Sequence, residues 1–216
     1  MNTANIVIVD YGMGNIRSVH NALVRMGSAV STSHLAEDLL AADALVLPGV
    51  GAFGEAVANL KARGLVEPIL EAVKQRGKPL LGICLGMQLL ADSSEERGTS
   101  RGLSLIPGEV RRIPVPSSLR LPHIGWNSVT LRRPDPLFSD ARDGDAYYFV
   151  HSYHFACDDA DIAATTDYGG DVVAAVQRGN VFGVQFHPER SQSKGLALLG
   201  NFVNHVNRTC MEGAPC

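Results

Sequence analysis

The sequence lacks a hydrophobic run long enough to cross a bilayer. Its longest apolar stretch, residues 79–91, is about a dozen residues, whereas a membrane-spanning helix needs about 20. Excess basic charge is missing as well, because 19 Lys and Arg face 22 Asp and Glu, for a net charge of −3. We therefore expect neither a membrane protein nor a nucleic-acid-binding surface. The apolar residues 6–9 begin almost at the N-terminus, so we expect no secretory signal peptide.

Cysteine is also scarce. The four cysteines show no paired spacing: Cys84, Cys157, Cys210 and Cys216. Their distribution fits a reducing cytoplasm better than a disulfide framework, so we expect a cytoplasmic protein. The composition is otherwise ordinary for a globular chain, with 45% hydrophobic residues, and 216 residues suffice to bury a substantial core. We see no internal repeat or linker and expect a single domain over residues 1–216.

In the first half of the chain, apolar strand-like segments alternate with segments of helical periodicity. The expected strands are residues 5–9, 29–32, 44–47 and 79–83, and the expected helices are residues 16–26, 35–41, 55–63, 66–76 and 85–91. Asn15 is in place to cap the first helix. This alternation predicts a doubly wound, mostly parallel α/β sheet.

The second half is rich in β-structure. It contains extended segments that we expect to be partly antiparallel, at residues 107–136, 146–156, 162–165, 172–177 and 181–186. Turns at residues 169–170 and 178–180 would join some of them. A last helix, residues 196–206, presents apolar side chains on one face. The predicted fold is therefore α/β, with an added antiparallel portion.

Cys84 stands where the strand at residues 79–83 turns into a helix, with Gly82 and Gly86 two residues away on either side. This G-x-C-x-G spacing is typical of a nucleophile elbow. The strained turn needs small flanking residues, and a thiol at a helix N-terminus is favoured as thiolate. The alternative is a buried core cysteine, and the stretch by itself leaves both open.

His187 and Glu189 are two residues apart, so an extended backbone would place both side chains on one face. Pro188 disfavours the helical region for His187. A carboxylate that accepts from an imidazole fixes its tautomer and stabilises the imidazolium. With Cys84, the pair predicts a catalytic triad; the alternative is a surface histidine near a carboxylate.

Residues 49–54 spell G-x-G-x-x-G between a strand and a helix. The acidic residue that a dinucleotide site requires about twenty positions later is missing, so we reject a nucleotide cofactor. We expect instead an oxyanion hole made from the backbone N–H of Val50 or Gly51 together with that of Leu85. His151 and His154 lie three apart in one expected strand, so they face opposite sides, and we expect no metal.

Taken together, the elbow cysteine, Gln88 and the late His-x-Glu resemble the class I, triad-type glutamine amidotransferases. The resemblance covers essentially the whole chain. Further stretches resemble one branch, the glutaminase subunits of imidazole glycerol phosphate synthases from histidine biosynthesis: residues 10–15, 48–53, 122–127, 149–153 and 185–189. The resemblance implies a flavodoxin-like fold of the amidotransferase type, without a cofactor.

Residue by residue, the resemblance implies Cys84 as nucleophile, His187 as general base and acid, and Glu189 as its orienting partner. Gln88 and Glu96 would contact bound glutamine, Glu96 at the α-amino group. Ammonia would pass to a (β/α)8-barrel cyclase subunit, which makes imidazole glycerol phosphate and an aminoimidazole carboxamide ribotide. At residue 190, where we would expect Lys, the chain has Arg.

Three alternatives remain open from the sequence. The chain resembles, less closely, the glutaminase component of a chorismate-using synthase or of another biosynthetic amidotransferase. A cysteine peptidase or deglycase on a related scaffold would need no partner and would not prefer free glutamine. A non-enzymatic binding module is disfavoured by the intact triad.

Overall fold

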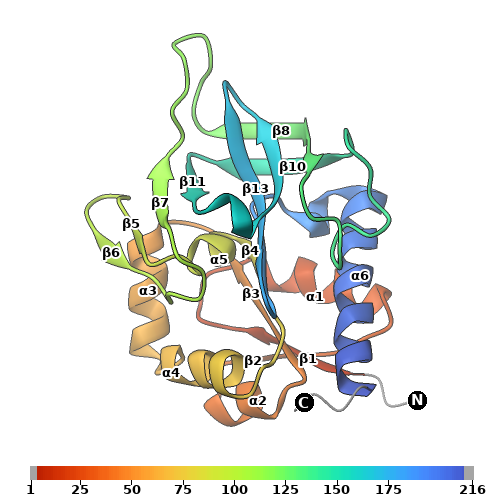
Figure 1. The fold of residues 1–216 in the computed structure, drawn as a ribbon. Helices are drawn as coiled ribbons and strands as arrows, with labels where there is room; N and C mark the ends of the chain where they lie inside the picture. Colours follow the sequence, from red (N-terminus) through yellow and green to blue (C-terminus); the bar gives the residue numbers. More distant parts are fainter. Residues whose placement is uncertain (1–3, 212–216) are drawn as a thin grey trace.

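A computed structural model describes residues 4–211 of the chain, so Cys216 lies outside the described residues. Its centre is an eight-stranded sheet with the strand order β2-β1-β3-β4-β14-β13-β12-β9 (Figure 1). In that order the strands are Ala29–Ser33, Asn5–Val9, Ala44–Gly49, Leu80–Cys84, Val181–Val184, Asp171–Arg178, Ile162–Asp167 and Thr130–Leu131. The first five strands run parallel and the last three are antiparallel. The predicted mostly parallel sheet with an antiparallel extension is confirmed.

Helices cover both faces of the sheet because its central strands are apolar on both sides. In β1, Val7 and Val9 belong to the core under one layer of helices, and Ile6 and Ile8 belong to the core under the other. The first layer contains α2 (Ala36–Ala41), α3 (Phe53–Ala62), α4 (Val66–Leu70) and the π-helical turn η1 (Glu71–Gln75), and the second contains α1 (Ile16–Arg25) and α6 (Gln192–Met211). Figure 1 shows the two layers on opposite sides of the parallel strands.

Several predicted details are wrong. Asn15 occupies the N-cap position of α1, but its side chain makes no capping hydrogen bond. The helix expected over residues 66–76 changes to π-helical geometry at Glu71. The helix after Cys84, α5 (Leu85–Gln88), is one turn long and ends before Ala91. In contrast, α6 begins earlier and ends later than its apolar face indicates.

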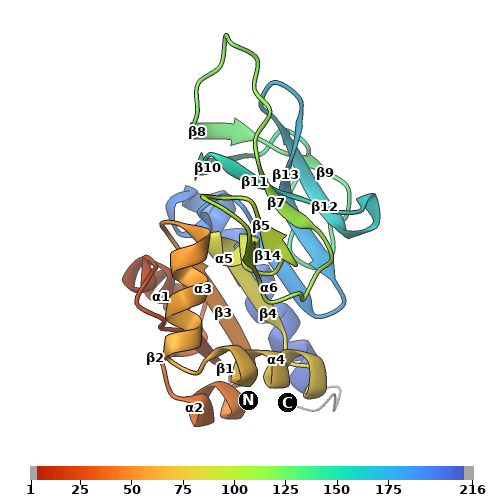
Figure 2. The ribbon, with the colours of Figure 1, turned by 90° about the vertical axis from the view of Figure 1, so that its left-hand side faces the viewer.

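Two small sheets lie above the carboxyl ends of the parallel strands (Figures 1 and 2). One pairs β8 (His123–Ser128) with β10 (Ala146–His151), antiparallel. The other has the order β11-β7-β5-β6, with bounds Tyr153–Ala156, Glu109–Arg112, Ser93–Ser94 and Ser100–Arg101. Short 3-10 turns at Asp159–Asp161 (η2) and Pro188–Arg190 (η3) complete the elements. These sheets form the roof of the cavity described below.

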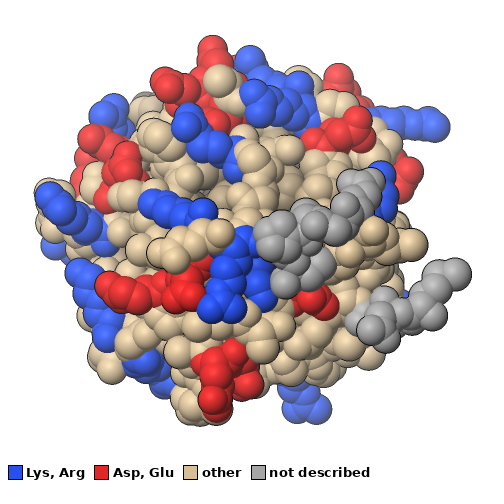
Figure 3. Space-filling view, turned by 60° about the horizontal axis from the view of Figure 1, so that its bottom comes forward, with Lys and Arg blue, Asp and Glu red and all other residues tan. Residues whose placement is uncertain are grey.

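No helix within residues 4–211 combines the length and the hydropathy needed to cross a membrane. Figure 3 shows the face at the bottom of Figure 1, where basic and acidic side chains are interspersed. The described residues of that face form no concentrated positive patch of the kind that tracks a phosphate backbone.

Candidate active site

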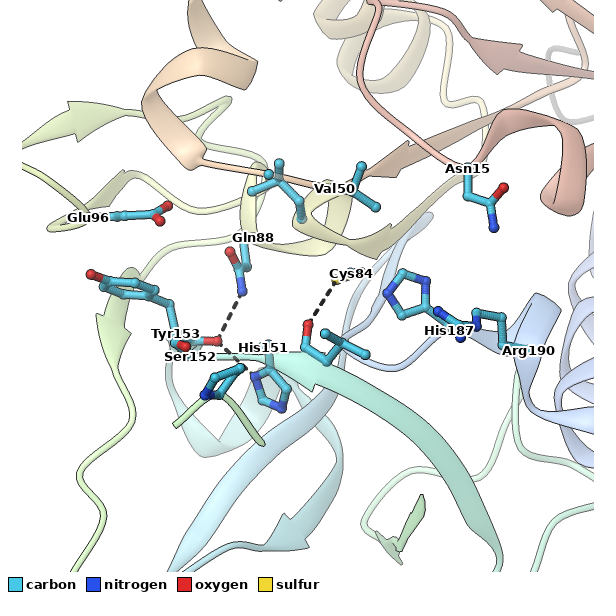
Figure 4. Close-up of a pocket in the computed structure, with 14 residues that line it drawn as sticks. Asn15, Val50, Cys84, Gln88, Glu96, His151, Ser152, Tyr153, His187 and Arg190 are labelled. Atoms are coloured by element: carbon cyan, nitrogen blue, oxygen red, sulfur yellow. Dashed lines mark hydrogen bonds between the residues drawn. The ribbon is translucent and has the colours of Figure 1, made fainter. Parts of the chain in front are cut away.

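The candidate site is a cavity of about 370 Å³ where the carboxyl ends of three neighbouring strands meet. The register of the sheet places Gly49 of β3 beside Cys84 of β4, and Val184 of β14 beside Ile83. Ligands of open α/β sheets bind at this edge. Residues 150–153, from the roof, close the opposite wall (Figure 4).

Cys84 ends β4 in a strained conformation, with φ 55° and ψ −111°. The glycines around it are needed for steric reasons. A Cβ on Gly82 would lie 2.6 Å from the backbone oxygen of Gly86, and a Cβ on Gly86 would overlap the backbone oxygen of Leu47. Backbone strain of this kind concentrates at functional sites. The turn predicted from the glycine spacing is therefore present, and it holds a mostly buried thiol against the cavity.

His187 and Glu189 are in direct contact, with Nδ1 and Oε1 2.9 Å apart, and both side chains are buried. The contact is made in a different way from the prediction. His187 is extended, at φ −98° and ψ 95°, but Glu189 lies in the 3-10 turn η3, which brings its carboxylate back under the ring. The His187 N–H donates to the carbonyl of Tyr148, which fixes the backbone. Among the described residues, Glu189 Oε2 is buried without a hydrogen-bond partner.

The electrostatics favour a protonated His187. Burial lowers its pKa, but hydrogen bonds and opposite charge from Cys84 and Glu189 outweigh burial and raise the pKa to about 10. Figure 4 shows the His187 ring beside Cys84. An imidazolium between a sulfur and a carboxylate is suited to stabilise a thiolate and to give a proton to a leaving group.

Val50, Gly51 and Leu85 all line the cavity. Val50 follows directly after β3, its side chain is partly exposed, and Gly51 has a φ of +102° that favours glycine. Leu85 is the first residue of α5, and N–H groups of a first helical turn have no partner within the helix. The three residues predicted from the sequence to form an oxyanion hole therefore line the same cavity as Cys84.

Gln88 and Glu96 line the other end of the cavity. Gln88 Nε2 donates to the backbone oxygen of Tyr153 at 3.0 Å and to Oε1 of Gln185 at 2.9 Å. Glu96 Oε2 accepts the backbone N–H of Phe53 at 2.7 Å. The cavity is thus lined by both a carboxylate and a thiol.

The two histidines considered as a metal pair lie in different strands, not in one. His151 ends β10, and His154 belongs to β11. His151 Nε2 is 3.0 Å from His123 Nδ1, and its own Nδ1 is 2.9 Å from the oxygen of Tyr153. Within residues 4–211, no group of three or more His, Cys, Asp or Glu side chains is arranged to hold a metal ion.

Two residues of this site have no role assigned from the sequence. Gln185 is completely buried, and its Nε2 lies 3.7 Å from Cys84 Sγ. Its position two residues before His187, directly after β14, was a signal that could have identified it. Arg190, which lines the cavity, stacks its guanidinium 4.4 Å from the centre of the Tyr148 ring. Arginine stacks well in this geometry, because its planar cation matches an aromatic face.

This fold and site define the class of the protein. The model of the family "Glutamine amidotransferase class-I" matches residues 7–206, and the chain belongs to that family. It is similar to proteins named "Imidazole glycerol phosphate synthase subunit HisH". The one from Moorella thermoacetica is 50% identical over 209 residues, covering 96% of this chain and 98% of that protein. The one from Syntrophotalea carbinolica is 49% identical over 203 residues, covering 91% and 98%.

Solved structures show the same fold at lower identity. A glutamine amidotransferase of known crystal structure has a TM-score of 0.73 at 20% identity, covering 93% of this chain and 98% of that chain. PurLQS from Thermotoga maritima has a TM-score of 0.71 at 21% identity, covering 95% of this chain and 100% of that chain. These similarities establish the fold, and the sequence relatives establish the branch of the family.

Proposed function

We propose that this chain is the glutaminase subunit of an imidazole glycerol phosphate synthase in histidine biosynthesis. It hydrolyses glutamine on Cys84 and delivers the ammonia to a cyclase subunit with a (β/α)8-barrel fold. The observation that carries the proposal is the buried contact of His187 with Glu189, beside the strained Cys84 at the edge of a cavity. The full-length similarity to the HisH proteins supports the partner and the pathway.

In the first half-reaction, the Cys84 thiolate attacks the side-chain amide carbon of glutamine. The carbonyl oxygen becomes an oxyanion, which the backbone N–H groups of Leu85 and of Val50 or Gly51 stabilise. His187 then gives its proton to the amide nitrogen, the C–N bond breaks, and ammonia leaves. A glutamyl thioester on Cys84 remains.

In the second half-reaction, neutral His187 takes a proton from water, and the resulting hydroxide attacks the thioester carbon. The C–S bond breaks, glutamate leaves, and the Cys84 thiolate with its imidazolium partner is restored. Glu189 orients the ring and stabilises its charge in both halves. The Glu96 carboxylate is suited to bind the α-ammonium group of glutamine, and Gln88 contacts the same substrate.

The chemistry needs only side chains and backbone of this chain, so the proposal includes no metal and no cofactor. It requires Cys84 to remain a reduced thiol, which a cytoplasmic location provides. No nucleic acid or membrane partner is part of it.

The test is an assay of the chain mixed with the cyclase subunit of the same organism, glutamine and the ribotide substrate of the cyclase. We expect glutamate and imidazole glycerol phosphate in equal amounts. Cys84→Ala abolishes the glutamine-driven reaction, while added ammonium salt still supports synthesis. Transfer of ammonia to a chorismate-using synthase component instead, or peptide cleavage without any partner, would overturn the proposal.

A further inference from the structure

Gln185 is a completely buried amide beside Cys84 that the triad chemistry leaves without a role. Strand β14 runs parallel to β4 with Val184 next to Ile83. The residues that follow these two, Gln185 and Cys84, are therefore neighbours at the end of the sheet. Gln185 Nε2 lies 3.7 Å from Cys84 Sγ, within the longer range of a hydrogen bond to sulfur.

The direction of this contact is fixed by a backbone carbonyl. The two ends of a glutamine amide are hard to tell apart, and their assignment follows from their partners. The oxygen of Tyr153 can only accept, so the Gln88 atom 3.0 Å from it is the nitrogen. That nitrogen also donates to Gln185 at 2.9 Å, which makes the contacted atom Oε1. The other end of the amide, turned to Cys84, is therefore the N–H donor.

Gln185 and His187 both belong to the short segment that follows β14, which ends at Val184. Gln185 Nε2 lies 3.7 Å from Cys84 Sγ and the His187 ring lies beside Cys84 (Figure 4), whereas Phe186 between them is buried in the core. The sulfur of Cys84 thus has two neighbours from one segment. His187 is a charged donor that must release its proton, and Gln185 is a neutral donor that keeps its protons.

We propose that Gln185 is a catalytic residue that donates a hydrogen bond to the Cys84 thiolate, and that Gln88 positions it. The proposal rests on the proposed function only in taking Cys84 as the nucleophile. The donor has two uses in the cycle. It holds the sulfur in place when glutamine arrives, and it stabilises the thiolate again when the C–S bond of the thioester breaks and His187 has just transferred its proton.

The test measures the thiolate directly, without glutamine or a partner. In the full-length chain, the rate of Cys84 alkylation by iodoacetamide is followed against pH, with the labelled cysteine identified by mass spectrometry. The midpoint of this rate against pH reports the ionisation of Cys84. Loss of a hydrogen bond to a charged group is expected to move that midpoint by about one pH unit or more. We expect Gln185→Met to raise the alkylation midpoint by that amount. Gln185→Glu keeps the shape, removes the donor and adds repulsion, so its midpoint rises further.

Turnover gives the second readout. In complex with the cyclase subunit, kcat for glutamate release by Gln185→Met falls roughly tenfold or more, while KM changes little, because a donor to the nucleophile does not bind the substrate. Gln177→Leu is the matched control. It removes an amide from the adjacent strand β13, outside the cavity lining, and leaves the midpoint and kcat unchanged.

A folded Gln185→Met or Gln185→Glu chain with an unchanged alkylation midpoint would overturn the proposal. If neither variant folds, the side-chain amide signal of Gln185 in the unaltered chain decides. The position of this signal should change with pH as Cys84 titrates, and it should not change with pH in the Cys84→Ala variant. A signal that is the same with and without Cys84 would refute the contact. A raised midpoint in a chain that fails to hydrolyse glutamine would refute the proposed function and leave this inference standing.

Discussion

Glu96 accepts the backbone N–H of Phe53, the first residue of α3, across 43 positions of sequence, at 2.7 Å. Gly51 lies two residues before Phe53, so this one carboxylate contacts the segment that leads from Val50 and Gly51 into the helix. Its position at the helix N-terminus is electrostatically favourable for a negative charge. The same side chain also lines the cavity.

We predict that Glu96→Gln weakens glutamine binding more than it slows chemistry. Loss of a charged hydrogen bond to the α-ammonium group costs about 1.5–3 kcal/mol. KM for glutamine therefore rises roughly 10-fold to 100-fold, and kcat falls less. Steady-state kinetics of glutamate release, in complex with the cyclase subunit, measure both. Glu95→Gln is the matched control, because Glu95 accepts the N–H of Arg112 and does not line the cavity. An unchanged KM for Glu96→Gln would contradict the assignment.

A second prediction compares Glu189→Gln with His187→Ala. In the proposed mechanism His187 transfers a proton in both half-reactions, and such a transfer contributes typically about 10²–10⁴-fold. The role proposed for Glu189 is to orient and stabilise the ring through the 2.9 Å contact, and Gln at this position would keep part of that contact. We expect the Glu189→Gln variant to be the more active of the two at saturating glutamine. Equal or reversed losses in turnover would mean that the two roles are misassigned.

The third prediction concerns the loop after β3. Gly49 and Gly51 flank Val50, so the peptide that carries the Val50 N–H can turn toward or away from the oxyanion at little steric cost. One missing oxyanion donor lowers turnover roughly 10²–10³-fold. We expect the isolated chain to be a poor glutaminase that docking of the cyclase with its ligand activates. Glutamate release by the chain alone and with saturating partner and ligand tests this. An activation of less than about tenfold contradicts the switch.

The fourth prediction follows from two buried histidines of the roof. His123 and His151 are buried and joined by a hydrogen bond, and His123 also stacks on Tyr168. Burial lowers the pKa of His123 to about 4 and that of His151 to about 3. Below about pH 6.5 these two histidines therefore bind protons in the unfolded chain but stay neutral in the folded chain. The free energy of unfolding should fall as the pH drops from about 6.5 to 4, by up to roughly 1.4 kcal/mol per pH unit for each histidine.

Chemical denaturation at a series of pH values measures this slope. His123→Gln removes one of the two groups and should flatten the curve over that range, even if it lowers stability overall. His34→Gln, at an exposed position, is the control and should leave the slope nearly unchanged. A parallel curve for His123→Gln would show that the histidine is not held neutral by the fold.

Sequence by itself determined the parts of this protein that depend on local backbone geometry. Gly82 and Gly86 identify the turn at Cys84, because a side chain at either position would collide with the adjacent backbone. Pro188 keeps His187 extended. β1 is apolar along almost its whole length, and such a run is typical of a parallel strand that helices cover on both faces.

Tertiary structure alone decided what depends on register between strands far apart in the chain. Gln185 meets Cys84 only because β14 lies next to β4 in one particular register, and no local pattern encodes a contact across 101 positions. His151 contacts His123 for the same reason, because the register between β10 and β8 places the two residues opposite each other. Glu189 reaches His187 through a 3-10 turn, not along a strand, because the chain bends there toward α6. The sequence determines the chemistry of each side chain. The partner of that side chain depends on packing that forms only when the whole sheet is assembled.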